Sequence, residues 1–228
     1  RLRGTTGKVF LTMKDLAAIK GRHYIHSLIE EGEHEQQDFK FAISDARKIA
    51  RSISAFSNHS GGRLLIGVKD NGVVAGIRNE EDVYMIETAA ELYCRPAVEV
   101  RMTAFKVDPG TVVIRAEIPK ALRPPVYVVE EGEVLRAYYR VKDENIVAHP
   151  LLLSAWEHYA ADTVAFMAFD EHHRLLIDII GEQGYATLDE FVRRSHLSRA
   201  TAIDLIGRLA AASVVNLEYR EGLLAISN

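Results

Sequence analysis

The sequence predicts an α+β fold in two parts: a mixed domain of helices and β-hairpins, followed by a small winged helix-turn-helix domain. In the first part, apolar runs flank tight-turn sequences at 70–72 and 108–110, which is typical of hairpins and not of alternating β-α units. In the second part, helical stretches come first and a short hairpin ends the chain. The predicted boundaries are an N-terminal extension over residues 1–22, a mixed domain over 23–160 and a winged helix over 161–228.

The helices of the mixed domain are predicted from apolar spacing and from residues that start or stop a helix. A short helix over 23–31 ends at Gly32. Ser44 is the expected N-cap of a helix over 45–58, and Gly61 and Gly62 then stop that helix. Helices are also expected at 79–94 and 150–161, and hairpins at 63–77, 97–118 and 124–142.

The C-terminal residues predict a different module. A helix over 170–183 ends at a glycine, and a helix over 187–195 is joined by two residues to a helix that begins after Ser198. Two short strands around Glu221 and Gly222 form the expected wing. Two functions are open for this module: it reads DNA, or it pairs with a second copy of itself. Acidic residues outnumber basic ones in it, which disfavours DNA reading.

Composition and short motifs argue against a membrane protein, a disulfide-bonded protein and an ATP-binding protein. The 228 residues are 48% hydrophobic with a net charge of −4, and no apolar run is long enough for a membrane span. Cys94 is the single cysteine, which excludes an internal disulfide and fits a cytoplasmic protein. Residues 4–8, Gly-Thr-Thr-Gly-Lys, are too short for a phosphate-binding loop, and Val9 replaces its Ser/Thr, so ATP binding is not expected.

One group of charged residues has the chemistry of a metal-dependent nuclease. Asp38 and Lys40 point to one face of a predicted strand, and Glu33 lies five residues earlier. With Asp70, two or three carboxylates can hold Mg²⁺ or Mn²⁺ while Lys40 stabilises a phosphate. The alternative is a solvated acidic loop, because Glu30, Glu31 and Glu35 extend the same run of charge.

Basic side chains suggest phosphate contacts in both parts of the chain. Arg47, Lys48 and Arg51 lie on one face of the helix over 45–58, although an ordinary solvated helix face has the same composition. In the winged helix, basic residues gather around the turn between its second and third helices: Arg193, Arg194 and Arg199.

Four sequence stretches together resemble a known family: Glu33 followed by Asp38-Phe39-Lys40, the helix end over 53–62, the run 64–77 and Tyr138 to Asn145. They are similar to the Schlafen AlbA-type domain over about residues 23–150. Bacterial members are labelled DNA-binding or divergent AAA ATP-binding proteins, frequently carry a C-terminal winged helix and are regarded as transcriptional regulators. Vertebrate Schlafens cut RNA with three carboxylates, which match Glu33, Asp38 and Asp70 here, Asp38 standing where Glu is usual.

The resulting expectation is a cytoplasmic, homodimeric DNA-binding regulator without a cofactor, and DNA is favoured over RNA as its partner. The alternative is a ribonuclease that uses Mg²⁺ or Mn²⁺. The expected phosphate contacts are Lys40, Arg47, Lys48, Arg51, Arg140, Lys142, Arg193, Arg194 and Arg199.

Overall fold

The computed structural model describes residues 16–77, 80–160 and 169–228. The chain divides into two compact units, a first one of Arg1–Ala121 with Val126–Ile146 and a second one of Leu122–Pro125 with Val147–Asn228. Helices and several sheets are present, which confirms the α+β class. No helix among the described residues has both the length and the apolar character that crossing a membrane requires.

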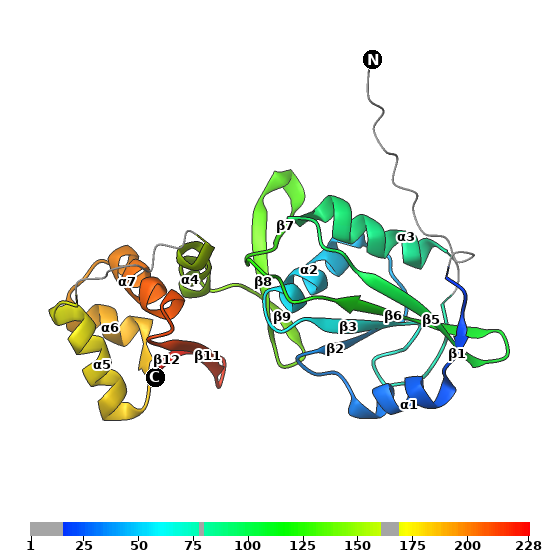
Figure 1. Cartoon of the computed structure of the whole chain (residues 1–228), viewed down its shortest axis with the longest axis horizontal. Coiled ribbons are helices and arrows are strands. Elements are labelled where there is room, and N and C mark those ends of the chain that lie inside the picture. The colour runs from blue at the N-terminus through cyan, green and yellow to red at the C-terminus, as the bar shows by residue number, and fades with distance from the viewer. Residues whose placement is uncertain (1–15, 78–79, 161–168) are drawn as a thin grey trace, which may run out of the picture. The chain divides into compact units, whose positions relative to one another are not determined.

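A five-stranded mixed sheet organises the first unit, in the strand order β1-β5-β6-β3-β2 (Figure 1). Its strands are β1 (Ile19–Lys20), β2 (Gln37–Lys40), β3 (Gly62–Ile66), β5 (Arg101–Asp108) and β6 (Thr111–Ile118). β1 and β2, the two edge strands, run parallel to their neighbours.

The expected N-terminal extension over 1–22 is therefore corrected. Residues 1–15, including the Gly-Thr-Thr-Gly-Lys stretch, lie outside the described residues. Ile19 pairs with Phe105 and Lys20 with Lys106, so these two residues form an edge strand of the sheet. Leu16 and Ala18 pack against the same core, and residues 16–22 thus belong to the first domain.

Helices cover the two faces of this sheet unequally (Figure 1). α2 (Ala46–Ser57) and α3 (Glu81–Thr88) pack on one face, where Ile53, Phe56, Ile86, Leu64 and Ile114 are fully buried. α1 (Arg22–Glu31) packs on the other face, over a smaller cluster around Phe39, Leu65, Phe105 and Val113. The pleat sends alternate residues of each strand to opposite faces, so both faces need apolar side chains.

A second sheet of four strands, in the order β4-β7-β8-β9, packs beside α2. Its strands are β4 (Cys94–Arg95), β7 (Tyr127–Val129), β8 (Leu135–Val141) and β9 (Glu144–Val147), and a 3₁₀ turn over Glu131–Glu133 joins β7 to β8 as expected. The helix expected over 79–94 is an α-helix only to Thr88 and continues as a π-helix over Ala89–Tyr93. Cys94 is buried, which raises the pKa of its thiol to about 12.

Local signals at the ends of α2 were predicted with one error. The N-cap is Asp45 and not Ser44, because the Asp45 carboxylate accepts a hydrogen bond from the backbone N–H of Arg47. At the other end, Gly61 has φ +75° and donates its N–H to the carbonyl of Phe56, which confirms the predicted helix stop.

The hairpin expected around residues 70–72 is shorter than predicted. Beyond β3 only one bridge, Val68 to Val74, joins its two arms among the described residues. The carbonyl of Gly67 accepts the N–H groups of both Ala75 and Gly76, which pulls the second arm out of strand geometry. Gly67 has φ +97°, and a Cβ there would lie 2.7 Å from the Gly76 backbone, so this close approach requires glycine.

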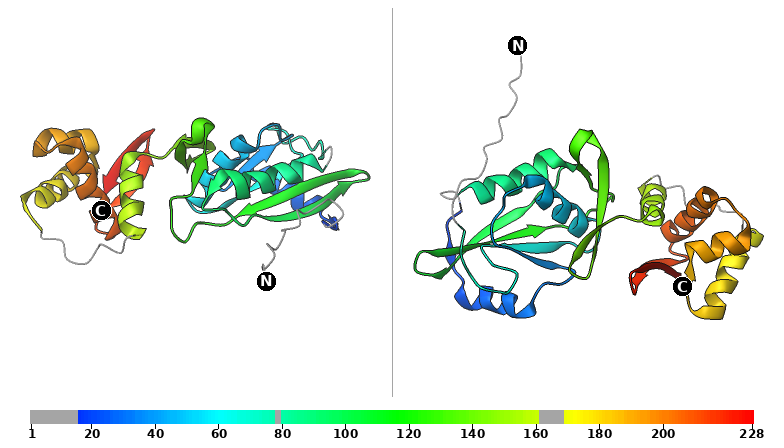
Figure 2. Two further views of the ribbon diagram at one scale, coloured as in Figure 1. Left: turned by 90° about the horizontal axis from the view of Figure 1, so that it is seen from above. Right: turned by 180° about the vertical axis from the view of Figure 1, so that it is seen from behind.

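The described residues of the second unit form four helices and a small sheet of the order β10-β12-β11 (Figure 2). The elements are α4 (Pro150–Ala160), α5 (Glu171–Gln183), β10 (Ala186–Thr187), α6 (Leu188–Ser195), α7 (Arg199–Ala211), β11 (Asn216–Arg220) and β12 (Leu223–Ser227). Ser198 caps α7 as predicted, accepting the N–H of Thr201. Because α4 packs along α7, the domain boundary expected at 160/161 moves to 146/147.

Candidate functional site

The structure brings together three of the four residues predicted for a nuclease. Asp38 is buried on β2, and its Oδ2 lies 2.6 Å from Nζ of Lys40, which confirms that the two side chains share a face. Glu33 precedes the strand, and its Oε1 accepts a hydrogen bond of 2.8 Å from the backbone N–H of Phe39. Burial raises the pKa of Glu33, and a hydrogen bond with Asp38 raises it further.

Arg140 completes this cluster from β8, although it was expected to contact phosphate from the surface. Its side chain is only 1% exposed and its NH2 lies 3.7 Å from Asp38 Oδ1. It donates to the carbonyls of His34 and Gln37, both at 3.2 Å, and to Asn145 Oδ1 at 2.9 Å. The expectation for Arg140 is therefore corrected: its guanidinium is held inside the first unit, where burial lowers its pKa.

These polar groups also close the free edge of β2. The carbonyl of Lys40 accepts the N–H of Gly67, just beyond β3, and the carbonyl of Gln36 accepts the N–H of Arg63. Because backbone groups alternate in direction along a parallel strand, those of Gln37 and Phe39 point away from β3. There Glu33 accepts the N–H of Phe39, and Arg140 donates to the carbonyl of Gln37. An unpaired strand edge is a site for unwanted pairing, so this arrangement has a structural use independent of catalysis.

Asp70 does not join Glu33 and Asp38. On β3 the residue paired with Asp38 is Leu64, and Asp70 lies in the exposed turn beyond the end of that strand. Across residues 16–77, 80–160 and 169–228, no three His, Cys, Asp or Glu side chains are grouped as a metal site would require. The carboxylate triad predicted from the sequence is thus present as a pair.

The basic face of α2 is partly neutralised by the segment that joins β7 to β8. Arg51 makes two parallel hydrogen bonds to Glu130, at 2.8 and 2.7 Å, which lower the pKa of Glu130 and raise that of Arg51. Arg47 lies 3.6 Å from Glu131 and stacks on the ring of Tyr93. Lys48 is exposed, and no carboxylate of the described residues lies within 4.0 Å of its amine.

The other predicted phosphate contacts are also of two kinds, exposed side chains and side chains paired with a carboxylate. Lys142 is exposed in the turn between β8 and β9, with φ +54°. In the second unit, Arg194 pairs with Glu182 at 2.8 Å and Arg199 pairs with Asp189, whereas Arg193 is exposed. Two of the three arginines expected to contact nucleic acid there are already held by carboxylates.

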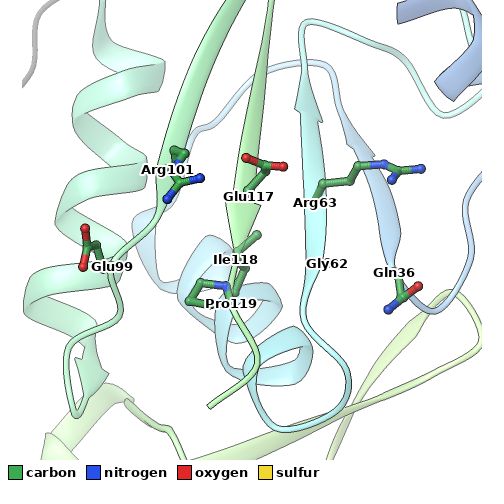
Figure 3. A pocket seen from close by; sticks show the side chains of 8 residues that line it. All are labelled: Gln36, Gly62, Arg63, Glu99, Arg101, Glu117, Ile118 and Pro119. Carbon is green, nitrogen blue, oxygen red and sulfur yellow. The ribbon is translucent and has the colours of Figure 1, made fainter. Parts of the chain in front are cut away.

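A row of polar residues on the five-stranded sheet was missed by the sequence analysis (Figure 3). Arg101, Glu117 and Arg63 are direct cross-strand partners on β5, β6 and β3, and they line a pocket on the part of the face that the α1 cluster does not include. Arg63 donates to Gln37 at 2.7 Å and pairs with Glu31, whereas Arg101 is exposed. Polar residues at alternate positions of 101–103 and 115–117 were the available signal.

Comparison with known proteins identifies the family. The family model described as Schlafen, AlbA_2 matches residues 33–149, just over half of the chain, and this protein therefore belongs to the Schlafen AlbA_2 family. The match includes the Glu33–Asp38 pair and β8 with Arg140. No curated protein sequence matches the chain.

Solved structures give two weaker similarities. The N-terminal domain of a RecG-related protein from Nitrosomonas europaea is 18% identical, with a TM-score of 0.41 over 57% of this chain and 96% of that one. A protein from Corynebacterium diphtheriae is 17% identical, with a TM-score of 0.41 over 54% of this chain. This chain covers only 27% of the length of the Corynebacterium protein.

Proposed function

We propose that this protein binds nucleic acid, DNA in preference to RNA, and acts as a transcriptional regulator without catalysis of its own. Membership of the Schlafen AlbA_2 family supports a nucleic-acid partner. A family alone does not define chemistry, so the proposal depends on which charges are available to a phosphate backbone.

The observation that carries the proposal is where the exposed, unpaired cations lie. Lys48, Arg101 and Lys142 of the first unit are exposed, and the described residues place no carboxylate within ion-pair distance of them. Arginines are paired with carboxylates to a similar extent in both units, but the second unit contains no lysine. Its paired arginines are Arg194, Arg199, Arg208 and Arg220. Binding to phosphates releases counterions only where a cation is free, so we assign the main contacts to the first unit.

The second unit supports the proposal in a different role. The order α5, β10, α6, α7, β11, β12 and the short connection between α6 and α7 support the proposal that this unit is a winged helix with a helix-turn-helix. Its acidic balance and paired arginines favour contact with a second copy of the chain over contact with DNA. A homodimer would also double the modest number of phosphate contacts in the first unit.

Removing the free cations should weaken binding in a salt-dependent way. We expect the double variant Lys48→Ala, Lys142→Ala to bind duplex DNA several-fold more weakly than wild type at low salt. The slope of log affinity against log salt should become shallower by roughly one for each phosphate that is no longer neutralised by a lysine. Fluorescence anisotropy with labelled duplex DNA, single-stranded DNA and RNA measures both quantities and compares the partners.

Arg220→Ala is the matched control, because Arg220 already pairs with Glu218 and its loss removes no free cation. An affinity that does not fall between low and physiological salt would contradict the proposal. So would an equal loss of affinity in the control and in the double variant.

A second candidate function is supported by the grouping of Glu33, Asp38 and Lys40. In a ribonuclease these carboxylates would hold Mg²⁺ or Mn²⁺, which would lower the pKa of a bound water, and Lys40 would stabilise the phosphate. Asp70 lies apart from this pair, and Oε1 of Glu33 already accepts the backbone N–H of Phe39. We therefore expect no cleavage of structured RNA in Mn²⁺. Gel electrophoresis of wild type, Glu33→Gln and Asp70→Ala checks this, and cleavage by wild type alone would establish the nuclease instead.

A further inference from the structure

Helix α4 makes close contacts along the length of α7, both within the second unit (Figure 2). The hydroxyl of Ser154 donates to the carbonyl of Ile203 at 3.3 Å, and Nε2 of His158 lies 2.8 Å from Oδ1 of Asp204. At Gly207 a Cβ would lie 2.1 Å from Oγ of Ser154, so glycine permits this approach of the two helices.

These contacts lie on the side of α7 that faces away from the domain core. Ala202, Ile206 and Leu209 are fully buried and recur at helical spacing, which defines the core-facing side. At 100° per residue, the centre of the α4 contacts at 203, 204 and 207 is roughly 140° around the helix from that side. Leu151 and Leu152 of α4 are themselves buried, so α4 is packed and not merely adjacent.

In a helix-turn-helix, the second helix enters the major groove with the side that faces away from its core. We propose that α4 is an intramolecular cover that occupies this side of α7 and prevents it from reaching the major groove of duplex DNA. The inference rests on the proposed winged helix and the proposed nucleic-acid function. It adds a second, hidden contact surface that becomes available only when α4 moves away.

The charges at the contact fit a cover. Asp204 is shared between His158 on α4 and Arg208 on α7, which lies 3.0 Å from its other carboxylate oxygen. Arg208 is exposed next to the covered side. Displacing α4 would open that side for a groove contact. A phosphate there would compete with Asp204 for Arg208, because an exposed ion pair within one helix is weak.

The test uses the full chain and two matched glycine substitutions. Gly207→Ala inserts a methyl group against Ser154 and should displace α4. Gly181→Ala is the control, because Gly181 is also in a helix and a Cβ there meets no atom within 4 Å. Both substitutions give the same gain in helix propensity, so a difference between them reports on the α4 contact.

We expect faster hydrogen exchange of the α4 amides in Gly207→Ala and at least a several-fold higher affinity for duplex DNA, neither of which Gly181→Ala should show. Adding Arg208→Ala should remove the gain in affinity. His158→Ala, which breaks the contact to Asp204 without added volume, serves if Gly207→Ala does not fold.

Two results would overturn the cover: unchanged exchange of α4 in both variants, or released α4 with no gain in affinity. The wild-type affinity tests the proposed function separately. Binding by Gly207→Ala but not by wild type would support the cover and contradict the assignment of contacts to the first unit.

Discussion

Replacing Arg140 by alanine is expected to lower the free energy of unfolding by about 3 kcal/mol, because the change breaks a buried ion pair and leaves its acid behind. Asp38 would keep Lys40 but lose the guanidinium on its other side. The carbonyls of His34 and Gln37 would each lose one of two donors and keep the backbone N–H of the other residue. The ring of Phe56, whose centroid is 4.8 Å from the guanidinium, would lose its cation–π contact. Urea denaturation followed by circular dichroism measures the change.

Lys142→Ala is the control for Arg140→Ala, since Lys142 is also basic but is exposed, in the turn that follows β8. Its effect on stability should stay within about 0.5 kcal/mol, as for most surface substitutions. Arg140→Lys should recover little, because a single ammonium cannot replace a planar fork of donors. Equal stability of wild type and Arg140→Ala would mean that the buried network contributes nothing to the fold.

Asn58→Ala should produce a loss of similar size, again about 3 kcal/mol, through unsatisfied backbone groups. The Asn58 amide lies at the end of α2 and donates to the carbonyls of Val126 and Tyr138, at 3.0 and 2.9 Å. Its oxygen accepts the N–H of Val126 at 2.7 Å. One side chain therefore joins the end of α2 to β8 and to the residue that precedes β7, and thermal or urea unfolding will show its loss.

Asn58→Asp separates hydrogen bonding from packing at this position. The aspartate has nearly the same shape but offers no donor, and its charge would face two carbonyl oxygens, so it should destabilise at least as much as alanine. Ser60→Ala, two residues away on an exposed side chain, should have little effect. If Asn58→Asp were as stable as wild type, the two amide donations would not matter.

These two residues give a structural meaning to part of the family resemblance. Asn58 and the glycines at 61 and 62 end α2, and Arg140 belongs to the Tyr138–Asn145 stretch that carries the resemblance. Each holds the first unit together through buried hydrogen bonds. The similarity to Schlafen AlbA-type domains therefore reports on the fold more directly than on a reaction.

Features that depend on neighbouring residues were predictable from the sequence. The stop of α2 at Gly61, the cap of α7 at Ser198 and the turn between β5 and β6 follow from backbone angles and hydrogen bonds within a few residues. The pairing of Asp38 with Lys40 belongs to the same class, because residues two apart on a strand share a face.

The availability of each charged residue was decided only by the tertiary structure. Arg51 meets Glu130, 79 residues away, and Arg140 meets Gln37, 103 residues away, so their sequence neighbourhoods held no sign of either contact. The register of β2 with β3 places Asp38 beside Leu64 and so separates it from Asp70. The packing of α4 on α7 covers a helix face that the sequence alone predicts to be exposed. Ion pairs and buried contacts depend on distances in space, and strand register and helix packing set those distances between segments far apart in the chain.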